Sequence, residues 1–303
     1  MGPTATTSDH PHLVRPAVPV DLARVVDLLP FGVLLLDERA AAIFANQAWI
    51  ALSGQGDQSW GGHRWLTALE RPERGPVRQE LISAMASRRR HQTDWVVPTA
   101  SGGHRILRAQ LTPDDEIPAL AGILTVLDIT EEQRRVDQLI ELATHDPLTG
   151  LVNRHQFVEF LDHALERHRR LPHLVTCVYF VDVDRFKAVN DTYGHPIGDE
   201  LLRAVGRQLA AVVRPMDVVA RFGGDEFVVL CEDLPAPEVA TTIARRLKGL
   251  SIEIPGTDRR CTLSVGWTLV DASSLDSTTL IRRADEAMYR DKHGVPDVHR
   301  GEA

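Results

Sequence analysis

The sequence predicts a two-domain protein of the α/β (α+β) class, and three observations lead to this prediction. A chain of 303 residues, 43% hydrophobic and 25% charged, has the size and composition of two ordinary globular domains. The front half has short apolar runs in the order two strands, helices, three strands. The back half combines a continuous apolar strand, an amphipathic helix and a hairpin joined by two glycines. We therefore expect two sheets, each flanked by helices.

The composition argues against several classes of protein. A net charge of -8 provides no overall basic field, so we expect no nucleic-acid partner. The three cysteines, Cys177, Cys231 and Cys261, lack a CxxC spacing, which argues against a disulfide framework and against a zinc site. Near the start, the longest apolar run is 31–36, which is too short to span a bilayer. We expect a cytoplasmic protein without a membrane segment.

The front half begins with a segment that has no sustained periodicity. Residues 1–20 are rich in Pro, Thr and His, and we expect them to form a flexible lead. From Asp21, apolar residues recur at helical spacing until Pro30. The further segments expected are strands at 32–37, 41–46, 93–99, 104–111 and 121–129, with helical stretches at 46–52 and 77–89.

The front domain closes with Asp128-Ile129-Thr130. With this ending, the order of its elements resembles a PAS domain over residues 21–130. The resemblance implies a sensor domain with an antiparallel sheet and helices. No sensor cofactor is predicted. His63, His91 and His104 are the candidate haem ligands, but a solvated loop histidine is far commoner than a ligand. Four tryptophans, namely Trp49, Trp60, Trp65 and Trp95, suit core packing, with a ligand pocket as the alternative.

Residues 131–145 are expected to form a linker helix. Thr130 is a candidate N-cap, with Gln133 in the capping-box position. An apolar stripe follows at helical spacing, formed by Val136, Leu139, Ile140 and Ala143. A two-stranded coiled coil would use this stripe and would make the chain a homodimer through the PAS domain and the helix. A helix packed on its own domain fits the pattern equally well.

The back domain, residues 146–303, contains a run typical of a strand buried on both faces. This run, 174–184, is continuously apolar and ends in Asp182 and Asp184. Carboxylates at the mouth of a buried strand are costly unless a positive group pairs with them. An amphipathic helix is expected to follow from a start at Gly198-Asp199.

Two β runs, 218–222 and 225–230, are joined by Gly223 and Gly224. We expect these two glycines to form a two-residue hairpin turn with positive φ at both positions, so that Asp225 comes directly after the turn. If the hairpin lies beside Asp182, the two carboxylates can share a divalent cation with backbone oxygen and nucleotide phosphates. For a single Gly-Gly-acidic segment, an ordinary acidic turn is the alternative.

Four motifs together resemble the GGDEF family of diguanylate cyclases over residues 140–295. They are DPLTGLVNR (146–154), DVDRFKAVNDTYGHPIGDE (182–200), RFGGDEF (221–227) and ADEAMYRDK (284–292). The resemblance implies a central sheet flanked by helices, like the palm of polymerases and class III cyclases. It further implies the condensation of two GTP into cyclic di-GMP and two pyrophosphates, with two Mg²⁺ or Mn²⁺ ions per GTP site. The competing function is a non-catalytic cyclic di-GMP receptor.

The resemblance also implies roles for single residues. The metal ligands would be Asp182, the Val183 carbonyl, Asp225 and Glu226. The catalytic groups would be Glu226 and Asp225, with Arg221 stabilising charge in the transition state. The substrate-binding residues would be Lys187 and Lys292 on the triphosphate, Asn190 and Asp199 on guanine, and Phe186. The alternatives are solvated surface lysines and, for Asp199, a helix N-cap.

Arg214-Pro215-Met216-Asp217 is separated from Gly223 by five residues and resembles the inhibitory RxxD site of the family. Arg214 and Asp217 would bind cyclic di-GMP, with Arg245 as a second arginine. A salt bridge in a surface turn is the alternative. One departure from the family stands near the end, where Pro296 takes the place of a basic residue and Arg300 is a possible substitute.

Overall fold

The structure is a computed structural model and describes residues 22–54, 60–99, 102–171, 173–271 and 276–294. The predicted flexible lead, Pro296 and Arg300 lie outside the described residues. Contacts divide the chain into two compact units, Met1–Val136 and Asp137–Ala303. No helix in the described ranges is long and apolar enough to cross a bilayer.

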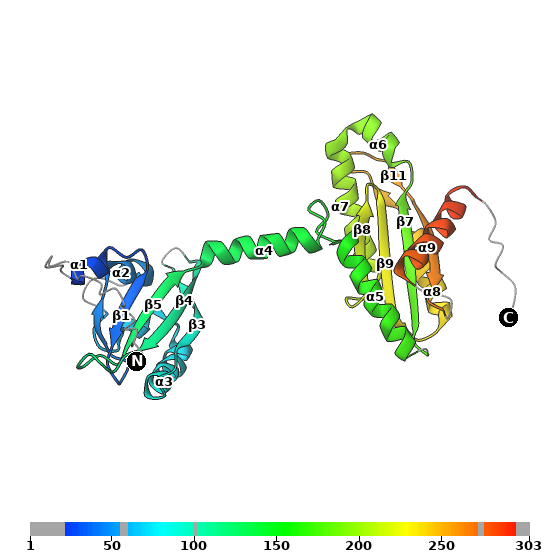
Figure 1. Cartoon of the computed structure of the whole chain (residues 1–303). Coiled ribbons are helices and arrows are strands. Elements are labelled where there is room, and N and C mark those ends of the chain that lie inside the picture. The colour runs from blue at the N-terminus through cyan, green and yellow to red at the C-terminus, as the bar shows by residue number, and fades with distance from the viewer. Residues whose placement is uncertain (1–21, 55–59, 100–101, 172, 272–275, 295–303) are drawn as a thin grey trace, which may run out of the picture. The chain divides into compact units, whose positions relative to one another are not determined.

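The front unit is an antiparallel sheet with helices (Figure 1). Its strands pair in the order β2-β1-β5-β4-β3, so the predicted sequence of two strands, helices and three strands is confirmed. The strands are β1 (Gly32–Leu36), β2 (Ala42–Ala45), β3 (His91–Pro98), β4 (His104–Pro113) and β5 (Gly122–Asp128). The helices are α1 (Leu22–Asp27), α2 (Gln47–Ser53), the 3-10 helix η1 (Arg64–Ala68) and α3 (Arg71–Ala86).

Tryptophans form the centre of the front core. Trp49 and Trp65 are fully buried, with ring centroids 6.2 Å apart in an edge-to-face arrangement, and Trp95 is 6.0 Å from Trp65. Trp60 is partly buried against the same core. These tryptophans therefore pack the core, which is the first of the two uses considered for them.

The three candidate haem ligands lie outside that core. The Nε2 atom of His63 is 2.9 Å from the carbonyl of Arg39. His91 lies 3.4 Å from a carboxylate oxygen of Glu80, and His104 is exposed at the start of β4.

One buried amide joins α1, β1 and α2. The Asn46 Oδ1 atom accepts hydrogen bonds from the backbone N–H groups of Val33 and Trp49, at 2.8 and 3.0 Å. Its Nδ2 atom donates to the carbonyls of Val26 and Phe31, both at 2.9 Å. The side chain is fully buried with both of its polar atoms satisfied, which is the condition under which a polar group stabilises a core.

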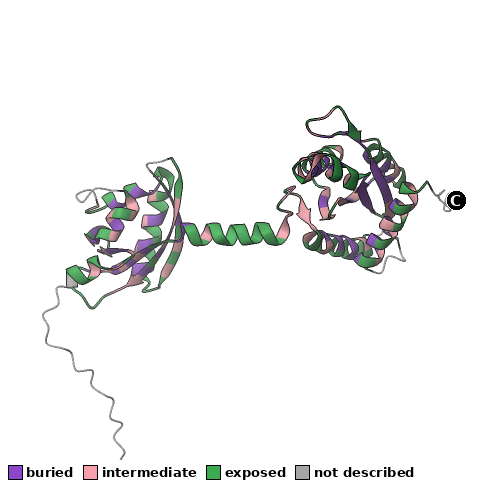
Figure 2. Cartoon of the chain, turned by 90° about the horizontal axis from the view of Figure 1, so that it is seen from above, coloured by how far each residue is buried: buried purple, intermediate pink, exposed green. Residues whose placement is uncertain are grey.

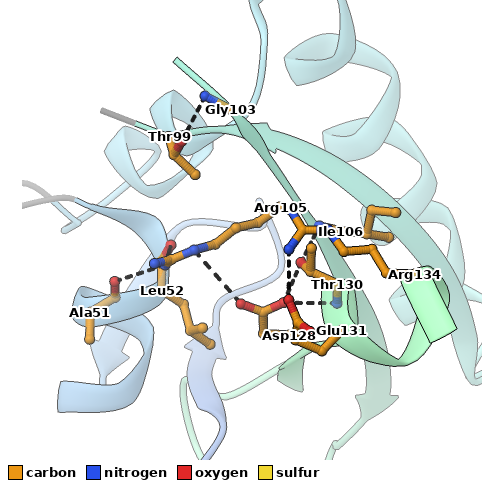
Figure 3. A network of polar contacts seen from close by, with 10 residues as sticks. All are labelled: Ala51, Leu52, Thr99, Gly103, Arg105, Ile106, Asp128, Thr130, Glu131 and Arg134. Carbon is orange, nitrogen blue, oxygen red and sulfur yellow. Dashed lines mark hydrogen bonds and ion pairs between the residues drawn. The ribbon is translucent and has the colours of Figure 1, made fainter. Parts of the chain in front are cut away.

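The linker helix α4 (Thr130–Thr144) begins at a polar network (Figure 3). The Thr130 hydroxyl accepts from the N–H of Ile106 on β4 at 2.9 Å and donates to Asp128. The first helical bond runs from Gln133 N–H to the Ile129 carbonyl, at 2.8 Å. Thr130 is therefore the first residue of the helix rather than its predicted N-cap. Its hydroxyl instead ties the helix to the sheet.

Arg105 extends this network from Asp128 to the end of α2. Its guanidinium lies 3.7 Å from the Asp128 carboxylate, and its Nη1 atom donates to the carbonyls of Ala51 and Leu52 near the end of α2 (Figure 3). Cationic donors suit this position, because the last carbonyls of a helix lack intrahelical partners. The start of α4 is thus connected to β4 and to α2.

The apolar stripe of α4 is exposed over its whole length. Val136, Leu139 and Ile140 are 43%, 65% and 56% exposed, and Ala143 is also exposed. Figure 2 shows α4 almost entirely in the colour of exposed residues. No described residue of the chain covers the stripe, so the packing of this helix on its own domain is not observed.

The back unit has a mixed sheet in the order β12-β7-β9-β8-β6, in which only β6 and β8 are parallel. Its strands are β6 (Val152–Asn153), β7 (Val175–Val183), β8 (Val218–Gly223), β9 (Glu226–Leu234) and β12 (Leu263–Leu269), beside a small hairpin of β10 (Ile252–Glu253) and β11 (Arg260–Cys261). Its helices are α5 (Arg154–Arg170), α6 (Phe186–Tyr193), α7 (His195–Val212), α8 (Pro237–Lys248) and α9 (Ser277–Lys292).

The central strand β7 is buried on both faces, as predicted. Its odd-numbered residues from Cys177 to Val183 pack in one core with α7 and α8. Its even-numbered residues Val178 and Phe180 pack in a second core with α5 and α9. Because side chains alternate along a strand, Asp182 points to the α5 and α9 face. All three cysteines are buried and free.

The start of α7 differs from the prediction. The helix begins at His195, with Gly194 as the N-cap residue at φ 82 and a proline in its first turn. Pro196 is well suited there, because the first helical N–H groups have no intrahelical partner. The predicted start at Gly198-Asp199 is therefore too late by one turn.

We predict that Thr130→Val destabilises the front unit by about 1–3 kcal/mol, because the partly buried N–H of Ile106 loses its acceptor. Urea unfolding followed by the fluorescence of the buried tryptophans measures this loss. Thr125→Val is the matched control, since its hydroxyl donates only to the Gln110 carbonyl at an exposed site. Equal destabilisation by the two variants would contradict the assigned role of Thr130.

Candidate active site

The site forms where β7 ends and β9 begins. Asp182, the penultimate residue of β7, lies directly opposite Glu226, the first residue of β9. The N–H of Val183 donates to the carbonyl of Asp225 at 3.2 Å, which holds the hairpin tip beside the strand end. Directly opposite residues of an antiparallel pair have Cβ atoms about 4.5–5.5 Å apart. The pairing therefore brings carboxylates 44 positions apart in sequence to one edge of the sheet.

The hairpin turn is displaced by one residue from its predicted position. Gly223 pairs with Glu226, so the two central residues of the turn are Gly224 and Asp225. Gly224 has φ 53, in the left-handed region that favours glycine, whereas Asp225 does not have a positive φ. The register between β8 and β9 is also irregular between Arg221 and Gly223. Asp225 is thus part of the turn and does not follow it.

An arginine clamps this turn from the side. The Nε and Nη2 atoms of Arg221 donate to the Gly224 carbonyl at 3.1 and 2.8 Å. Its Nη1 atom lies 3.1 Å from both carboxylate oxygens of Asp146, which also accepts from the N–H and hydroxyl of Thr149. Burial raises the pKa of Asp146, but these hydrogen bonds outweigh burial and lower it. Asp146 is therefore an anion that positions Arg221 against the turn.

Aromatic packing supports the strand that leads into the turn. The Phe222 ring makes edge-to-face contacts with Phe180 and Phe157, at centroid distances of 5.5 and 6.4 Å. The guanidinium of Arg154 lies 4.6 Å from the Phe222 centroid, in a cation–π contact. The hairpin is thus held at its base as well as at its tip.

The electrostatics of the site combine buried carboxylates with one cation. Asp182 is only 7% exposed, and burial raises its pKa against the lowering effect of the Lys292 ammonium. Burial also raises the pKa of Glu226, with further contributions from the negative charges of Asp285, Asp182 and Asp225. Such a cluster favours a bound cation, because neighbouring like charges disfavour the ionised forms.

Lys292 places an ammonium on Asp182, with 2.6 Å between Nζ and Oδ1. Burial lowers the pKa of Lys292, but Asp182 and the acidic groups nearby raise it overall. The helix that carries Lys292 lies very close to β12, because a Cβ at Gly266 would come within 1.9 Å of the Met288 nitrogen. Glycine at position 266 therefore allows α9 to bring Lys292 to the site.

The donor set fits a hard divalent cation only in part. Asp182 and Glu226 offer carboxylate oxygens, which Mg²⁺ and Mn²⁺ prefer. No group of three or more His, Cys, Asp or Glu side chains within the described ranges could hold a metal by itself. A backbone carbonyl such as that of Val183 and the phosphates of a nucleotide would have to complete the coordination, as the sequence predicts.

Asp184 has a different environment from Asp182. Its Oδ1 and Oδ2 atoms accept hydrogen bonds from the hydroxyls of Ser264 and Thr262, at 2.6 and 2.5 Å. Its N–H donates to the Thr262 carbonyl at 3.0 Å. Asp184 therefore joins β7 to the start of β12, and of the two carboxylates only Asp182 faces Glu226.

A second group of predicted residues meets between α6 and α7. The Oδ1 atom of Asn190 is buried, and no described residue donates a hydrogen bond to it. A Cβ at Gly198 would lie 1.9 Å from this oxygen and 3.3 Å from the Phe186 ring, so only glycine leaves space here. Asn190 thus has an acceptor available for a ligand, which suits a donor edge such as that of guanine.

Asp199 lies in the second turn of α7, where it caps nothing, so the alternative role as an N-cap is wrong. Within the described residues its carboxylate has no hydrogen-bond or ion-pair partner. Lys187 is exposed on α6, and its ammonium likewise has no partner in the described part of the chain. The guanine-binding role of Asp199 and the phosphate-binding role of Lys187 stay predictions.

The comparison with known protein families follows the same division of the chain. A family model described as "Diguanylate cyclase, GGDEF domain" matches residues 143–295, and one described as "PAS fold" matches residues 26–134. The chain belongs to the GGDEF family. Its GGDEF domain follows a PAS domain, as the motifs of the two halves predict.

Three relatives show the range of proteins that contain a similar segment. The probable diguanylate cyclase DgcE of Escherichia coli K12 is 32% identical over 276 residues, which cover 89% of this chain and 25% of DgcE. The diguanylate cyclase DgcM of that strain is 35% identical over 204 residues, with 66% of this chain and 48% of DgcM covered. The cyclic di-GMP phosphodiesterase PdeR is 39% identical over 170 residues, with coverages of 55% and 25%. The chain spans a quarter to a half of the length of these relatives.

In the GGDEF domain, the RxxD segment forms a tight turn before β8. The Asp217 Oδ2 atom accepts from the Arg214 N–H at 2.8 Å, and the Asp217 N–H donates to the Arg214 carbonyl at 3.0 Å. No salt bridge joins the side chains of Arg214 and Asp217, both of which the structure describes, so the salt-bridge alternative is wrong. Arg245 lies on α8, and within the described ranges no hydrogen bond or ion pair joins it to Arg214 or Asp217.

Two residues important to the geometry of this GGDEF domain are absent from the predicted site. Asp146 belongs to the DPLTG motif, and Gly198 to the GHPIGD stretch. The signal for Gly198 is a glycine within a helical pattern, which usually marks a close contact. The signal for Asp146 is an acidic residue in a turn, which by itself does not reveal a partner 75 positions away.

We predict that Asp146→Asn destabilises the GGDEF domain by about 2–4 kcal/mol, because it leaves the guanidinium of a largely buried pair uncompensated. Asp233→Asn is the matched control, since the Arg167–Asp233 pair is exposed and such pairs contribute about 0.2–1 kcal/mol. Differential scanning calorimetry resolves the transition of this domain. Comparable losses in the two variants would refute a structural role for the buried pair.

Proposed function

We propose that this chain is a diguanylate cyclase, which condenses two GTP molecules into cyclic di-GMP and two pyrophosphates. The observation that carries the proposal is the pairing of Asp182 with Glu226, at an edge where Lys292 already places a cation. Membership of the GGDEF family supports the same conclusion. The reaction needs carboxylates here because they hold the cations that bring each reacting phosphate and the attacking hydroxyl together.

The proposed site holds Mg²⁺ or Mn²⁺, two ions for each GTP, through Asp182, the Val183 carbonyl, Asp225 and Glu226. When bound, the ions lower the pKa of the attacking 3′-hydroxyl and neutralise charge on the phosphates. Glu226 is the proposed acceptor of the hydroxyl proton.

The proposed residues for recognition of guanine are Asn190 and Asp199. The unpartnered Asn190 Oδ1 and the unpartnered Asp199 carboxylate, within the described part of the chain, are acceptors, and guanine presents N1–H and N2–H₂ donors. Adenine lacks donors in this arrangement, so the site is expected to select GTP over ATP. Lys187 and Lys292 would contact the triphosphate and Phe186 the nucleotide, and Arg221 would stabilise the developing charge from β8, beside the turn.

Synthesis of a cyclic dinucleotide requires two GTP sites that face each other, and each chain is expected to supply one. We propose a homodimer formed through the PAS domain and α4, supported by the uncovered apolar stripe of α4. In this proposal the PAS domain changes the alignment of the two catalytic domains, and the place of action is the cytoplasm. Cyclic di-GMP bound at Arg214, Asp217 and Arg245 would inhibit the enzyme.

A cyclic di-GMP receptor without activity is the second candidate. It is favoured by the RxxD turn, in which no described residue forms a bond with the Arg214 guanidinium and an anionic ligand could approach it. The decisive experiment incubates the purified chain with GTP and Mg²⁺ and detects the product by chromatography. Synthesis of cyclic di-GMP that EDTA abolishes supports the cyclase. Binding of added cyclic di-GMP without synthesis supports the receptor.

Asp182→Asn is expected to lower cyclic di-GMP synthesis by at least about 10³-fold, because a neutral amide is a much weaker ligand for a divalent cation. Asp184→Asn is the control, since the Asp184 carboxylate is already engaged with the hydroxyls of Thr262 and Ser264. It should stay within about tenfold of the parent while melting at a lower temperature. Equal loss of activity in both variants would remove the distinction drawn between the two carboxylates.

Gly198→Ala is expected to raise the KM for GTP by about tenfold or more, because the added methyl group displaces the Asn190 side chain. Gly206→Ala in the same helix is the control. There the nearest contact is the flexible end of Leu151, at 2.9 Å, and Asn190 is undisturbed. Steady-state kinetics with GTP test this, and an unchanged KM in Gly198→Ala would argue against guanine binding at Asn190.

A further inference from the structure

Lys292 is the last residue of α9, so the position of its ammonium on Asp182 depends on how that end of the helix is held. Helix ends fray, because their last carbonyl groups have no intrahelical partners. The lysine side chain is itself long and flexible. Contacts made by the neighbouring residues of α9 are therefore needed to keep the ammonium in place.

The residue directly before Lys292 is Asp291, which makes two contacts outside its own helix. Its Oδ2 atom accepts a hydrogen bond from the Val265 N–H on β12, at 3.2 Å. Its Oδ1 atom pairs with the ammonium of Lys248, at the end of α8. The bond to the strand is partly buried and the ion pair is exposed, so we expect the bond to the strand to contribute more.

The contact with Val265 lies at the edge of the sheet. β12 is an edge strand of the described sheet, so every second N–H along it lacks a neighbouring strand to accept its hydrogen bond. Val265 lies opposite Val181 on β7, and its N–H points outward to Asp291. The helices α8 and α9 pack in the cores on opposite faces of this sheet. Asp291 thus joins two helices and the edge strand at one point.

This point is adjacent to the proposed metal site. Ser264, the neighbour of Val265, lies directly opposite Asp182 across the β7–β12 pair. The Ser264 hydroxyl donates to Asp184 at 2.6 Å, so two different carboxylates hold successive residues of β12. The end of α9 is therefore fixed one residue away from the cross-strand partner of Asp182.

The stability of the helix does not account for an aspartate at position 291. A carboxylate in the last turn of a helix interacts unfavourably with the helix dipole, whereas the basic Arg290 and Lys292 on either side interact favourably. Aspartate is also among the weaker helix formers. The contacts with β12 and α8 compensate for both effects.

We propose that Asp291 is a positioning residue of the reaction, which fixes the end of α9 on β12 and so holds Lys292 on Asp182. The inference rests on the proposed function, in which Lys292 contacts the triphosphate. The two described bonds of the Asp291 carboxylate go to Val265 and Lys248, so its effect on the site passes through the lysine that follows it. The alternative is a merely structural role, whose effect would not depend on Lys292.

The test measures Mg²⁺-dependent binding of α,β-methylene GTP to the full chain by isothermal titration calorimetry. In this analogue a methylene group replaces the oxygen that leaves with pyrophosphate, so binding is measured without turnover. Asp291→Ala is expected to weaken binding by about tenfold or more, because the end of α9 loses its tie to β12. Asp291→Asn keeps an oxygen acceptor for the Val265 N–H and is expected to stay within about threefold of the parent.

Glu286→Ala is the matched control, because Glu286 is an acidic residue of the same helix in an exposed pair with Arg282. It removes a carboxylate from α9 and leaves the contact with β12 intact, so the affinity for the analogue should be unchanged. All affinities are measured well below the melting temperature of the least stable variant. An equal loss of affinity in Glu286→Ala and Asp291→Ala overturns the inference.

A double-mutant cycle separates positioning from a structural role. If Asp291 acts through Lys292, Asp291→Ala has no further effect on the affinity for the analogue once Lys292→Ala is present. A structural role would weaken binding by a similar factor in both backgrounds, and that outcome overturns the inference. Unchanged affinity in Lys292→Ala alone overturns it as well.

The same measurements distinguish this inference from the proposed function. If the parent chain binds the analogue but forms no cyclic di-GMP, the proposed function fails, and the affinities of the variants still decide whether Asp291 positions Lys292. If cyclic di-GMP is formed, Asp291→Ala should raise the KM for GTP by about tenfold and lower kcat less. A loss confined to kcat overturns the inference, and a parent chain that binds no analogue in the presence of Mg²⁺ overturns both.

Discussion

The register between β7 and β9 is the constraint on which the candidate site depends. It places Asp182 opposite Glu226, and a slip of one residue would turn the carboxylate of the displaced strand to the opposite face of the sheet. The same register sets Phe180 opposite Val228 on the face that packs against α5 and α9. Because that core is dry and closely packed, a slip would expose several apolar side chains at once. The polar edge is therefore positioned by apolar packing further along the same strands.

At this edge of the sheet, basic side chains from other elements compensate the clustered carboxylates. Lys292 reaches Asp182 from the end of α9, and the close approach of that helix at Gly266 makes this reach possible. Arg221 is shared between Asp146 and the Gly224 carbonyl, so the tip of the hairpin is held by a charged group from a distant motif. These contacts leave the carboxylates preorganised, which reduces the reorganisation that a bound nucleotide would otherwise require.

In the front unit, a few polar contacts likewise fix the start of α4. Thr130 and Asp128 fasten the first turn of the helix to β4, and Arg105 continues the connection to the end of α2. Beyond this point the helix leaves its apolar stripe uncovered within the described chain. The contacts between α4 and the PAS core are therefore concentrated at the first turn of the helix.

Periodicity and motif order alone determined the two-domain architecture, the order of the PAS strands, the double burial of β7 and the residues expected at the site, because these depend on local pattern. Tertiary structure decided what pattern cannot encode. The turn lies at Gly224 and Asp225, one residue later than predicted, because Gly223 pairs with Glu226. Asp199 does not cap α7, because that helix begins at His195. The Asp146–Arg221 pair and the contacts of Asp291 join segments distant in sequence, and such contacts follow only from the packing of the whole domain.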